Sequence, residues 1–307
     1  MKLLRWAVIF ILAFLSGILF VQYLSVHPLQ MSLYLVATCV ALFGLILVLV
    51  FDFKRLSLFI AIGLSLVLFI AGHLTMTHII LNRPDPRPVP ELTRLPGDPG
   101  LGHTAVVYFT HGEPETFNPI GWINQFNEFD EQNIDFIPMI ARPFFFNALR
   151  NKYLEVGKSD HRMMHGQMIN ALEAAYRAEG DQTTKFYLSF LDDNPRPDAA
   201  AIQALNEGAS RIIVSEVFLT ISSHTAEGEH QINELEIEEH FNVPVILTGP
   251  LYDSDLLKSM FVERANANIG DTPKDKVGIL LVGHGQPDEW DVEWPTETEQ
   301  EIGFRKD

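Results

Sequence analysis

Three long apolar stretches open this sequence and constrain its fold more than any other feature. They run from Trp6 to Ser25, from Met31 to Phe51 and from Ser57 to Leu81, with no Asp, Glu, Lys or Arg inside them. A helix of roughly 20 residues is about 30 Å long, which matches the hydrocarbon layer of a bilayer. The sequence therefore predicts a membrane region over residues 1–82 with three transmembrane helices, and a multi-pass protein of the cell membrane.

The first apolar stretch is not expected to be a cleaved signal peptide. A signal peptide would explain this stretch alone, but two more spans follow it closely. Basic residues near the ends divide four to three between the two sides: Lys2, Arg5, Lys54 and Arg55 against Arg83, Arg87 and Arg94. The positive-inside rule then favours an N-terminus inside and the remaining chain outside. So small a margin leaves the membrane side open.

The remainder of the chain is strongly acidic. Residues 83–307 hold 18 Lys and Arg against 38 Asp and Glu, a formal charge of −20, whereas the whole chain carries −17. Such a charge repels phosphate backbones, so it argues against a nucleic-acid partner and favours metal ions or cationic partners. Residues 83–102 are rich in Pro and Gly, which predicts a semi-rigid linker.

Short apolar runs alternate with helix-like segments beyond the linker. This alternation predicts an α/β fold with a parallel sheet. We expect a first domain over residues 103–270 and the start of a second, incomplete α/β domain over residues 271–307, so that the sequence is a fragment. The predicted strands are Thr104–Thr110, Thr184–Phe190, Arg211–Leu219, Pro244–Thr248 and Val277–Gly283, and the predicted helices are 160–179, 198–207, 226–240 and 254–267.

Three histidines follow predicted strands, at the edge where parallel sheets bind ligands. His111 and His284 each stand in a His-Gly-x-Pro turn, and His224 lies in the loop after the third strand. Two imidazoles over one crevice favour a divalent-metal site formed by His111 and His224. A hydrogen-bonded loop histidine remains the plainer alternative for each. Phosphate-binding loops are absent from the sequence, so we expect no nucleotide cofactor.

Other polar and aromatic residues allow two interpretations. Glu227, Glu229 and His230 suit outer metal ligands or proton acceptors, but acidic residues also offset the dipole at a helix N-terminus. Phe144–Phe146, together with Trp122 and Phe126, suit either the wall of a flat ligand site or, more commonly, a packed core. The histidines on predicted helices are expected at the surface: His161, His165 and His240.

The stretch from about residue 104 to residue 290 resembles the class II tetrapyrrole chelatases, the superfamily of ferrochelatase and the sirohydrochlorin chelatases. The likeness lies in VVYFTHGEP, SRIIVSEVFLTISSHTAEGE, VPVILTGPLYDSDLLKSMFVERAN and ILLVGHGQPDEW. A shorter segment, NKYLEVGKS, is similar to the Tyr-x-x-Ile-Gly-Gly-x-Ser segment of ferrochelatase but has Lys158 where its second glycine stands. The membrane region and the missing second half depart from the family's pattern.

The resemblance implies a metal chelatase, a lyase that inserts Fe or Co, or a similar ion such as Ni or Zn, into a tetrapyrrole. His224 would correspond to a metal ligand of the cobaltochelatases and His284 to the catalytic histidine of ferrochelatase. With His111 these form the expected catalytic set. The metal ion and the tetrapyrrole are then substrates, and the bilayer is the third partner. A non-catalytic carrier and an inactive membrane-tethered scaffold are the alternatives. The chemistry of this family is usually cytoplasmic, whereas the count of basic residues favours a location of the remaining chain outside the membrane.

Overall fold

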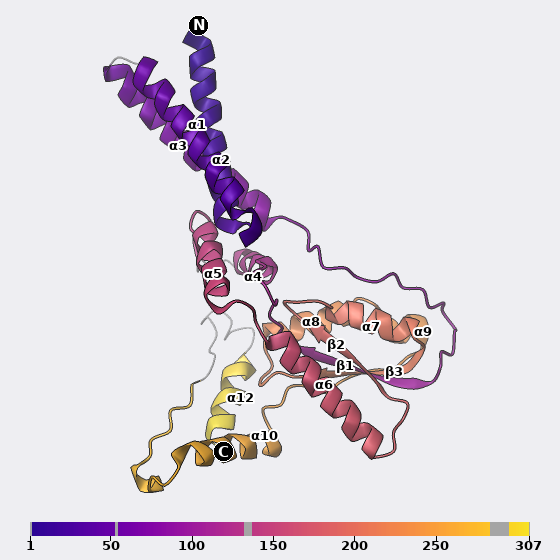
Figure 1. Cartoon of the computed structure of the whole chain (residues 1–307). Helices are drawn as coiled ribbons and strands as arrows, with labels where there is room; N and C mark the ends of the chain where they lie inside the picture. Colours follow the sequence, from indigo (N-terminus) through magenta and orange to yellow (C-terminus); the bar gives the residue numbers. More distant parts are fainter. Residues whose placement is uncertain (1, 53–54, 132–136, 283–294, 307) are drawn as a thin grey trace. The chain divides into compact units, whose positions relative to one another are not determined.

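The computed structural model describes residues 2–52, 55–131, 137–282 and 295–306 (Figure 1). Two compact units can be distinguished by their internal packing. Unit 1 comprises Met1–Pro86 and Pro114–Asp160, and unit 2 comprises Arg87–Glu113 and His161–Asp307.

The three predicted membrane spans are all helical. Unit 1 begins with α1 (Lys2–Ser25), α2 (Pro28–Asp52) and α3 (Arg55–Leu81). Each contains at least 23 residues that are apolar enough to cross a bilayer. The prediction of three candidate spanning helices is confirmed, and the chain is a multi-pass membrane protein on this basis.

Helices α1 and α3 approach each other through glycines. A Cβ atom added to Gly17 would lie 2.1 Å from the carbonyl oxygen of Phe69, and one added to Gly72 would lie 2.1 Å from that of Phe14. Neither position therefore tolerates a side chain. Close approach of backbones at small residues is a common way for helices to associate in lipid, where burial of apolar side chains gives little driving force.

Two further helices, α4 (Ile120–Glu131) and α5 (Arg142–Val156), belong to the same unit. Helix α5 packs against α1, and α4 packs against α3. The buried guanidinium of Arg150 donates to the carbonyl of Tyr23 over 2.6 Å and to that of Val26 over 3.1 Å. This side chain ties α5 to the C-terminal end of the first span.

The aromatic residues of α4 and α5 pack on one another. The Trp122 and Phe145 rings are 4.6 Å apart between centroids, and the Phe126 and Phe146 rings are 5.8 Å apart. Phe126 and Phe146 are almost fully buried. Of the two interpretations given to this cluster, the geometry therefore favours a packed core.

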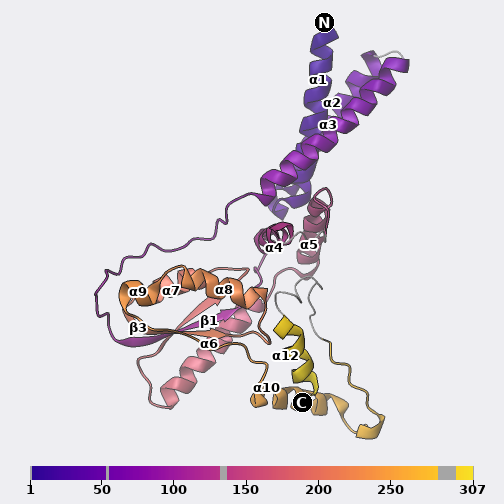
Figure 2. The ribbon, with the colours of Figure 1, turned by 180° about the vertical axis from the view of Figure 1, so that it is seen from behind.

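Unit 2 contains a four-stranded, fully parallel sheet in the order β2-β1-β3-β4. Figures 1 and 2 show α7, α8 and α9 over one face and α6 over the other. This arrangement confirms the predicted α/β fold. The strands are β1 (His103–Thr110), β2 (Lys185–Phe190), β3 (Ala209–Glu216) and β4 (Val245–Leu247), and the helices are α6 (His161–Ala178), α7 (Pro197–Asn206), α8 (Ser223–Asn233), α9 (Ile237–Phe241), α10 (Asp255–Ile269), the 3-10 turn η1 (Lys274–Lys276) and α12 (Pro295–Lys306).

Two predicted elements of unit 2 were wrong. The helix expected over residues 226–240 is split into α8 and α9, because Glu236 takes a left-handed backbone conformation with φ 46°. The fifth strand expected over Val277–Gly283 does not form across residues 277–282, where Leu280 is 86% exposed. This run lines a pocket together with α10 and α12 and does not pair with the short β4. Gly283 and His284 lie outside the described residues.

The proline-rich segment is attached to unit 2 along part of its length. The side chain of Asn206, at the end of α7, accepts hydrogen bonds from the backbone N–H groups of Thr93 and Arg94 and donates to the carbonyl of Glu91. Arg94 is buried and donates to the carbonyls of Asp98 and Ala209. Residues 91–98 are thereby held by specific polar contacts.

Candidate metal-binding edge of the sheet

His111 is positioned by the end of β1 and by the glycine that follows it. Gly112 has φ +84°, and a Cβ atom there would lie 2.6 Å from the Cβ atom of Phe190. The turn therefore requires glycine for its conformation and for the close approach of β2. The side chain of His111 is 46% exposed, so it can reach a ligand at the carboxyl edge.

Asp192 lies beside His111 because the backbones of β1 and β2 continue to pair beyond the regular strands. The N–H of Leu191 donates to the carbonyl of Thr110 over 3.1 Å, and the N–H of Asp192 donates to that of His111 over 2.8 Å. The carboxylate Oδ2 of Asp192 is then 3.4 Å from Nδ1 of His111. Sequence reasoning missed this residue, although it is the first acidic side chain after a predicted strand.

His224 reaches the same edge from the first turn of α8. Thr225 Oγ1 accepts the N–H of Ser222 over 2.9 Å, which fixes the start of the helix. Farther along, Gly228 lies against the Phe109 ring, and a Cβ atom there would be 2.2 Å from Cζ. This close approach sets α8 directly on β1. The imidazoles of His111 and His224 consequently lie 4.7 Å apart between ring centroids.

The hydrogen bonds of the two imidazoles favour one nitrogen of each for metal binding. Nδ1 of His111 lies 3.1 Å from the carbonyl oxygen of Gly112, and Nδ1 of His224 lies 3.2 Å from Oγ of Ser223. A polar partner at Nδ1 typically orients a metal-binding histidine, whose Nε2 then takes the ion. The Gly112 carbonyl only accepts, so Nδ1 of His111 carries the proton in this contact, whereas the Ser223 hydroxyl can donate to Nδ1 of His224 or accept from it.

This edge is a two-histidine arrangement with an adjacent carboxylate. Within residues 2–52, 55–131, 137–282 and 295–306, no group of three or more His, Cys, Asp or Glu side chains is arranged to hold a metal ion. In the described geometry the Asp192 carboxylate accompanies Nδ1 of His111, on the side away from Nε2. An ion held by the two imidazoles would take its remaining ligands from water or from a bound molecule.

The other acidic candidates have separate roles. The carboxylate of Glu227 accepts from the Gln231 side chain over 3.2 Å, whereas exposed His230 pairs with Glu234 over 3.3 Å at the surface. Glu229 lies near the buried carboxyl of Glu216, which ends β3 and is 1% exposed. Burial and then the Glu229 charge raise the pKa of Glu216 to about 7.

His161 and His165 are not the surface residues expected from the sequence. Both are half-buried on the α6 face that meets the sheet, and burial lowers the pKa of each. Their rings lie beside Phe190 of β2, at centroid distances of 6.1 and 6.2 Å. Helical periodicity did not predict which face of α6 is buried. Apolar Met163 and Met164 lie on the exposed face, whereas His161 and His165 lie on the half-buried face.

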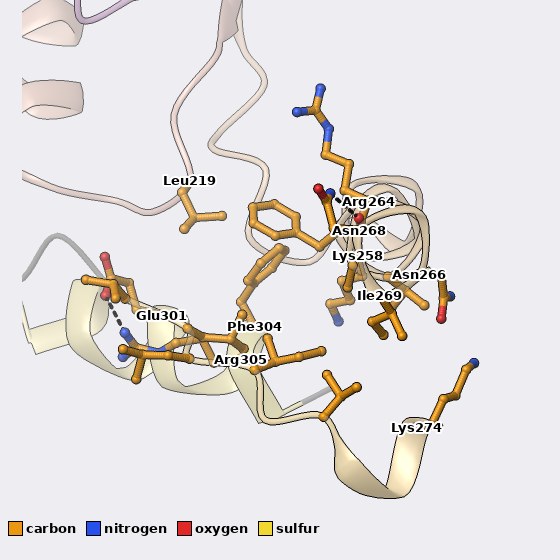
Figure 3. Close-up of a pocket in the computed structure, with 18 residues that line it drawn as sticks. Leu219, Lys258, Arg264, Asn266, Asn268, Ile269, Lys274, Glu301, Phe304 and Arg305 are labelled. Atoms are coloured by element: carbon orange, nitrogen blue, oxygen red, sulfur yellow. Dashed lines mark hydrogen bonds and ion pairs between the residues drawn. The ribbon is translucent and has the colours of Figure 1, made fainter. Parts of the chain in front are cut away.

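A separate pocket of about 730 Å³ is formed by α10, α12 and residues 277–282 (Figure 3). Phe261 and Phe304 meet edge to face inside it at 5.4 Å. Its basic lining residues are Lys258, Arg264, Lys274 and Arg305. His111, Asp192 and His224 do not line this pocket. This pocket is therefore separate from the candidate metal site.

Comparisons with known proteins do not assign the chain to a family. No model of a protein family matches the chain, and no curated protein matches it. What is established is a chain with three N-terminal candidate membrane helices and an α/β region built on a parallel four-stranded sheet.

Proposed function

We propose that this chain is a membrane-anchored protein of the class II chelatase type, which inserts a divalent metal ion such as Fe or Co into a tetrapyrrole. The observation that carries the proposal is the pair formed by His111 and His224, whose rings lie 4.7 Å apart at the carboxyl edge of a parallel sheet. The family resemblance of the surrounding stretches supplies the substrate class. His284, which the resemblance also implicates, lies outside the described residues.

The chemistry of insertion suits a site with few protein ligands. The metal ion must be released to the macrocycle, and two pyrrole N–H protons must be accepted as the four metal–nitrogen bonds form. Two neutral imidazoles bind a borderline divalent ion through exchangeable bonds. Once the ion has left, the same nitrogens are able to accept protons. His111 and His224 would thus deliver the metal and then act as bases.

A metal or tetrapyrrole carrier on the same fold is the alternative function. A carrier that retains its ion is better served by three or four ligands, whereas the described residues offer an imidazole pair with one carboxylate nearby. This difference favours transfer over storage. Turnover separates the functions: several metallated products per chain support the enzyme, and one stoichiometric event supports the carrier. Failure to bind any metal ion would support a scaffold.

Metal titration of the full chain in detergent tests the site itself. His111→Ala and His224→Ala should each weaken Co²⁺ or Zn²⁺ binding by about 1 to 3 kcal/mol. The double variant should lose little more than either single variant, because both ligands serve one ion. Binding should also weaken as the pH falls, since protons compete with the ion for the imidazole lone pairs.

The matched control is His230→Ala. His230 is also on α8 but is exposed and paired with Glu234. It should leave the affinity unchanged. Calorimetry that gives the same affinity and the same number of bound ions for the wild type and the double variant would contradict the proposed site. Metal binding by the wild type without metallation of a tetrapyrrole would instead contradict the assigned chemistry.

A further inference from the structure

A second pair of histidines lies on α6, one helical turn apart. His161 and His165 stand at positions i and i+4, which places both side chains on one face of the helix. Their ring centroids are 4.3 Å apart, and their Nε2 atoms are 3.2 Å apart. The two nitrogens that can bind a ligand therefore already point at each other.

The separation of the two Nε2 atoms matches the bite of a chelated metal ion. Zinc–imidazole bonds are about 2.0 to 2.1 Å long, so two such bonds at octahedral or tetrahedral angles place the nitrogens roughly 2.9 to 3.4 Å apart. The observed 3.2 Å lies within that interval. Histidines spaced four apart on one helix are a known way to present two ligands to zinc. Here the sequence is His-Arg-Met-Met-His, without the acidic residue of metalloproteases.

Tyr108 supplies an orienting partner behind the pair. Its hydroxyl lies 2.9 Å from Nδ1 of His165, and the Tyr108 side chain is 2% exposed on β1. Burial raises the pKa of Tyr108 to about 12, so the phenol stays neutral and can either donate or accept. A metal-bound His165 would carry its proton on Nδ1 and donate it to the Tyr108 oxygen. Such an outer hydrogen bond fixes the ring of a metal ligand.

Without a metal ion, the same contacts form a hydrogen-bonded chain. The Tyr108 hydroxyl then donates to Nδ1 of His165, and Nε2–H of His165 donates to Nε2 of His161. Binding an ion needs a tautomer change at His165, in which its proton moves from Nε2 to Nδ1, and a rotation of both rings away from the Nε2–Nε2 hydrogen bond. The tautomers are assigned from the contacts. Lone pairs on both Nε2 atoms would then face the ion.

The surroundings keep these imidazoles neutral and compensate a bound cation. Burial lowers the pKa of both rings, which favours the unprotonated form that binds metals. On the pKa of His161, the negative charges of Glu113 and Asp193 act in the opposite direction, whereas the neighbouring His111 acts in the same direction as burial. The negative charge of Glu113 would attract a divalent ion as well, while Asp193 is already paired with Arg162.

We propose that His161 and His165 form a second chelating site, distinct from His111 and His224, for a borderline divalent transition-metal ion such as Zn²⁺, Co²⁺ or Ni²⁺. Tyr108 is its positioning residue, and water completes the coordination. This site does not depend on tetrapyrrole chemistry, so it stands whether or not the chain is a chelatase.

The experiment uses the His111→Ala/His224→Ala chain in detergent, so that the first histidine pair cannot contribute to the measured binding of Zn²⁺. Zn²⁺ titration by calorimetry should still show one bound ion per chain. His161→Gln or His165→Gln in this background should lower the affinity at least about tenfold, since one chelating bond is lost. Tyr108→Phe should lower it by about tenfold while leaving both ligands present.

A register control keeps the number of histidines constant. Met163→His combined with His165→Gln moves the second imidazole to a position i+2, which faces away from His161 on the helix. Met163 is 48% exposed, so the exchange should be tolerated, as far-UV circular dichroism can verify. The register variant should bind as weakly as His165→Gln. Zn²⁺ affinity equal to that of the parent background in this variant would overturn the proposal, as would the absence of any bound ion in the parent.

Discussion

In the membrane helices of unit 1 the large apolar side chains face outward, whereas in the sheet of unit 2 they face inward. Leu33 and Phe59 are 68% and 73% exposed on α2 and α3, but Val107 and Phe109 of β1 have no exposed surface. Glycines stand where the backbones of α1 and α3 approach each other, at Gly17 and Gly72. Large apolar side chains are thus exposed on the helices of unit 1 and buried in the sheet of unit 2.

The difference follows from the solvent that each unit faces. Water drives large apolar groups into an interior, so unit 2 gains stability by burying them. Lipid tails are as apolar as leucine, so α1 and α3 gain little from such burial and associate through close backbone packing instead. A helix whose surface is apolar on all sides therefore indicates lipid contact rather than a misfolded core.

The largest effect is expected from Gly228→Ala, at a point where unit 2 also packs through a glycine. The added Cβ would lie 2.2 Å from the buried Phe109 ring, so α8 must move off β1. We expect a loss of about 3 kcal/mol in the free energy of unfolding of unit 2, together with loss of the His111–His224 contact. Gly166→Ala on α6, where nothing lies within 4 Å, is the control and should be neutral or stabilising. Similar denaturant midpoints for both variants would contradict this packing.

A somewhat smaller effect is expected from Gly72→Ala in the membrane unit. Its Cβ would lie 2.1 Å from the Phe14 carbonyl oxygen, so α1 and α3 must separate, at a cost of about 2 kcal/mol. Gly63→Ala on the same helix meets no atom within 4 Å and should be harmless. Thermal unfolding in detergent compares the two variants. Equal melting temperatures would show that the glycine contact does not hold α1 and α3 together.

Glu216 is a buried carboxyl at the end of β3, and it makes the stability of unit 2 depend on pH. Its pKa is raised from 4.5 to about 7 in the folded state, so the folded chain keeps a proton that the unfolded chain releases. This contribution is complete below pH 4.5 and is lost as the pH rises to about 7.

Glu216→Gln should remove that dependence and stabilise unit 2 by about 2 kcal/mol at pH 8 relative to the wild type. The amide introduced at this position can donate to the neighbouring Glu229 carboxylate, so burial of the new group is compensated. Denaturant unfolding at pH 5 and pH 8 measures the change, with the exposed Glu179→Gln as the control. Parallel pH profiles for the wild type and Glu216→Gln would contradict a buried proton at this site.

The smallest effect is expected in the proline-rich segment that adjoins the sheet unit. Asn206→Ala removes the hydrogen bonds to Glu91, Thr93 and Arg94 and should cost about 1 kcal/mol. Proteolysis within residues 83–102 should become faster, while the melting temperature changes little. Gln203→Ala, one turn earlier on α7, removes only an exposed contact to Glu207 and should not alter cleavage. Unchanged cleavage in Asn206→Ala would show that the segment is held by other contacts.

The sequence by itself determined the features that depend on local pattern. Uninterrupted apolar length predicted α1, α2 and α3, because the bilayer fixes how many apolar residues a helix needs. Alternating buried runs predicted β1 to β4 and their parallel sheet. The loops after β1 and β3 then had to share one edge, which is why His111 and His224 were expected together.

Only the tertiary structure decided the contacts between segments that are far apart in the sequence. The run at 277–282 is as apolar as β1, yet it lacks a strand partner and stays outside the sheet. Asp192 approaches His111 only because β1 and β2 pair beyond their ends, and α6 brings His165 to Tyr108 by its rotation on the sheet. Hydropathy and spacing do not encode such non-local contacts, because each is set by the packing of segments far apart in the chain.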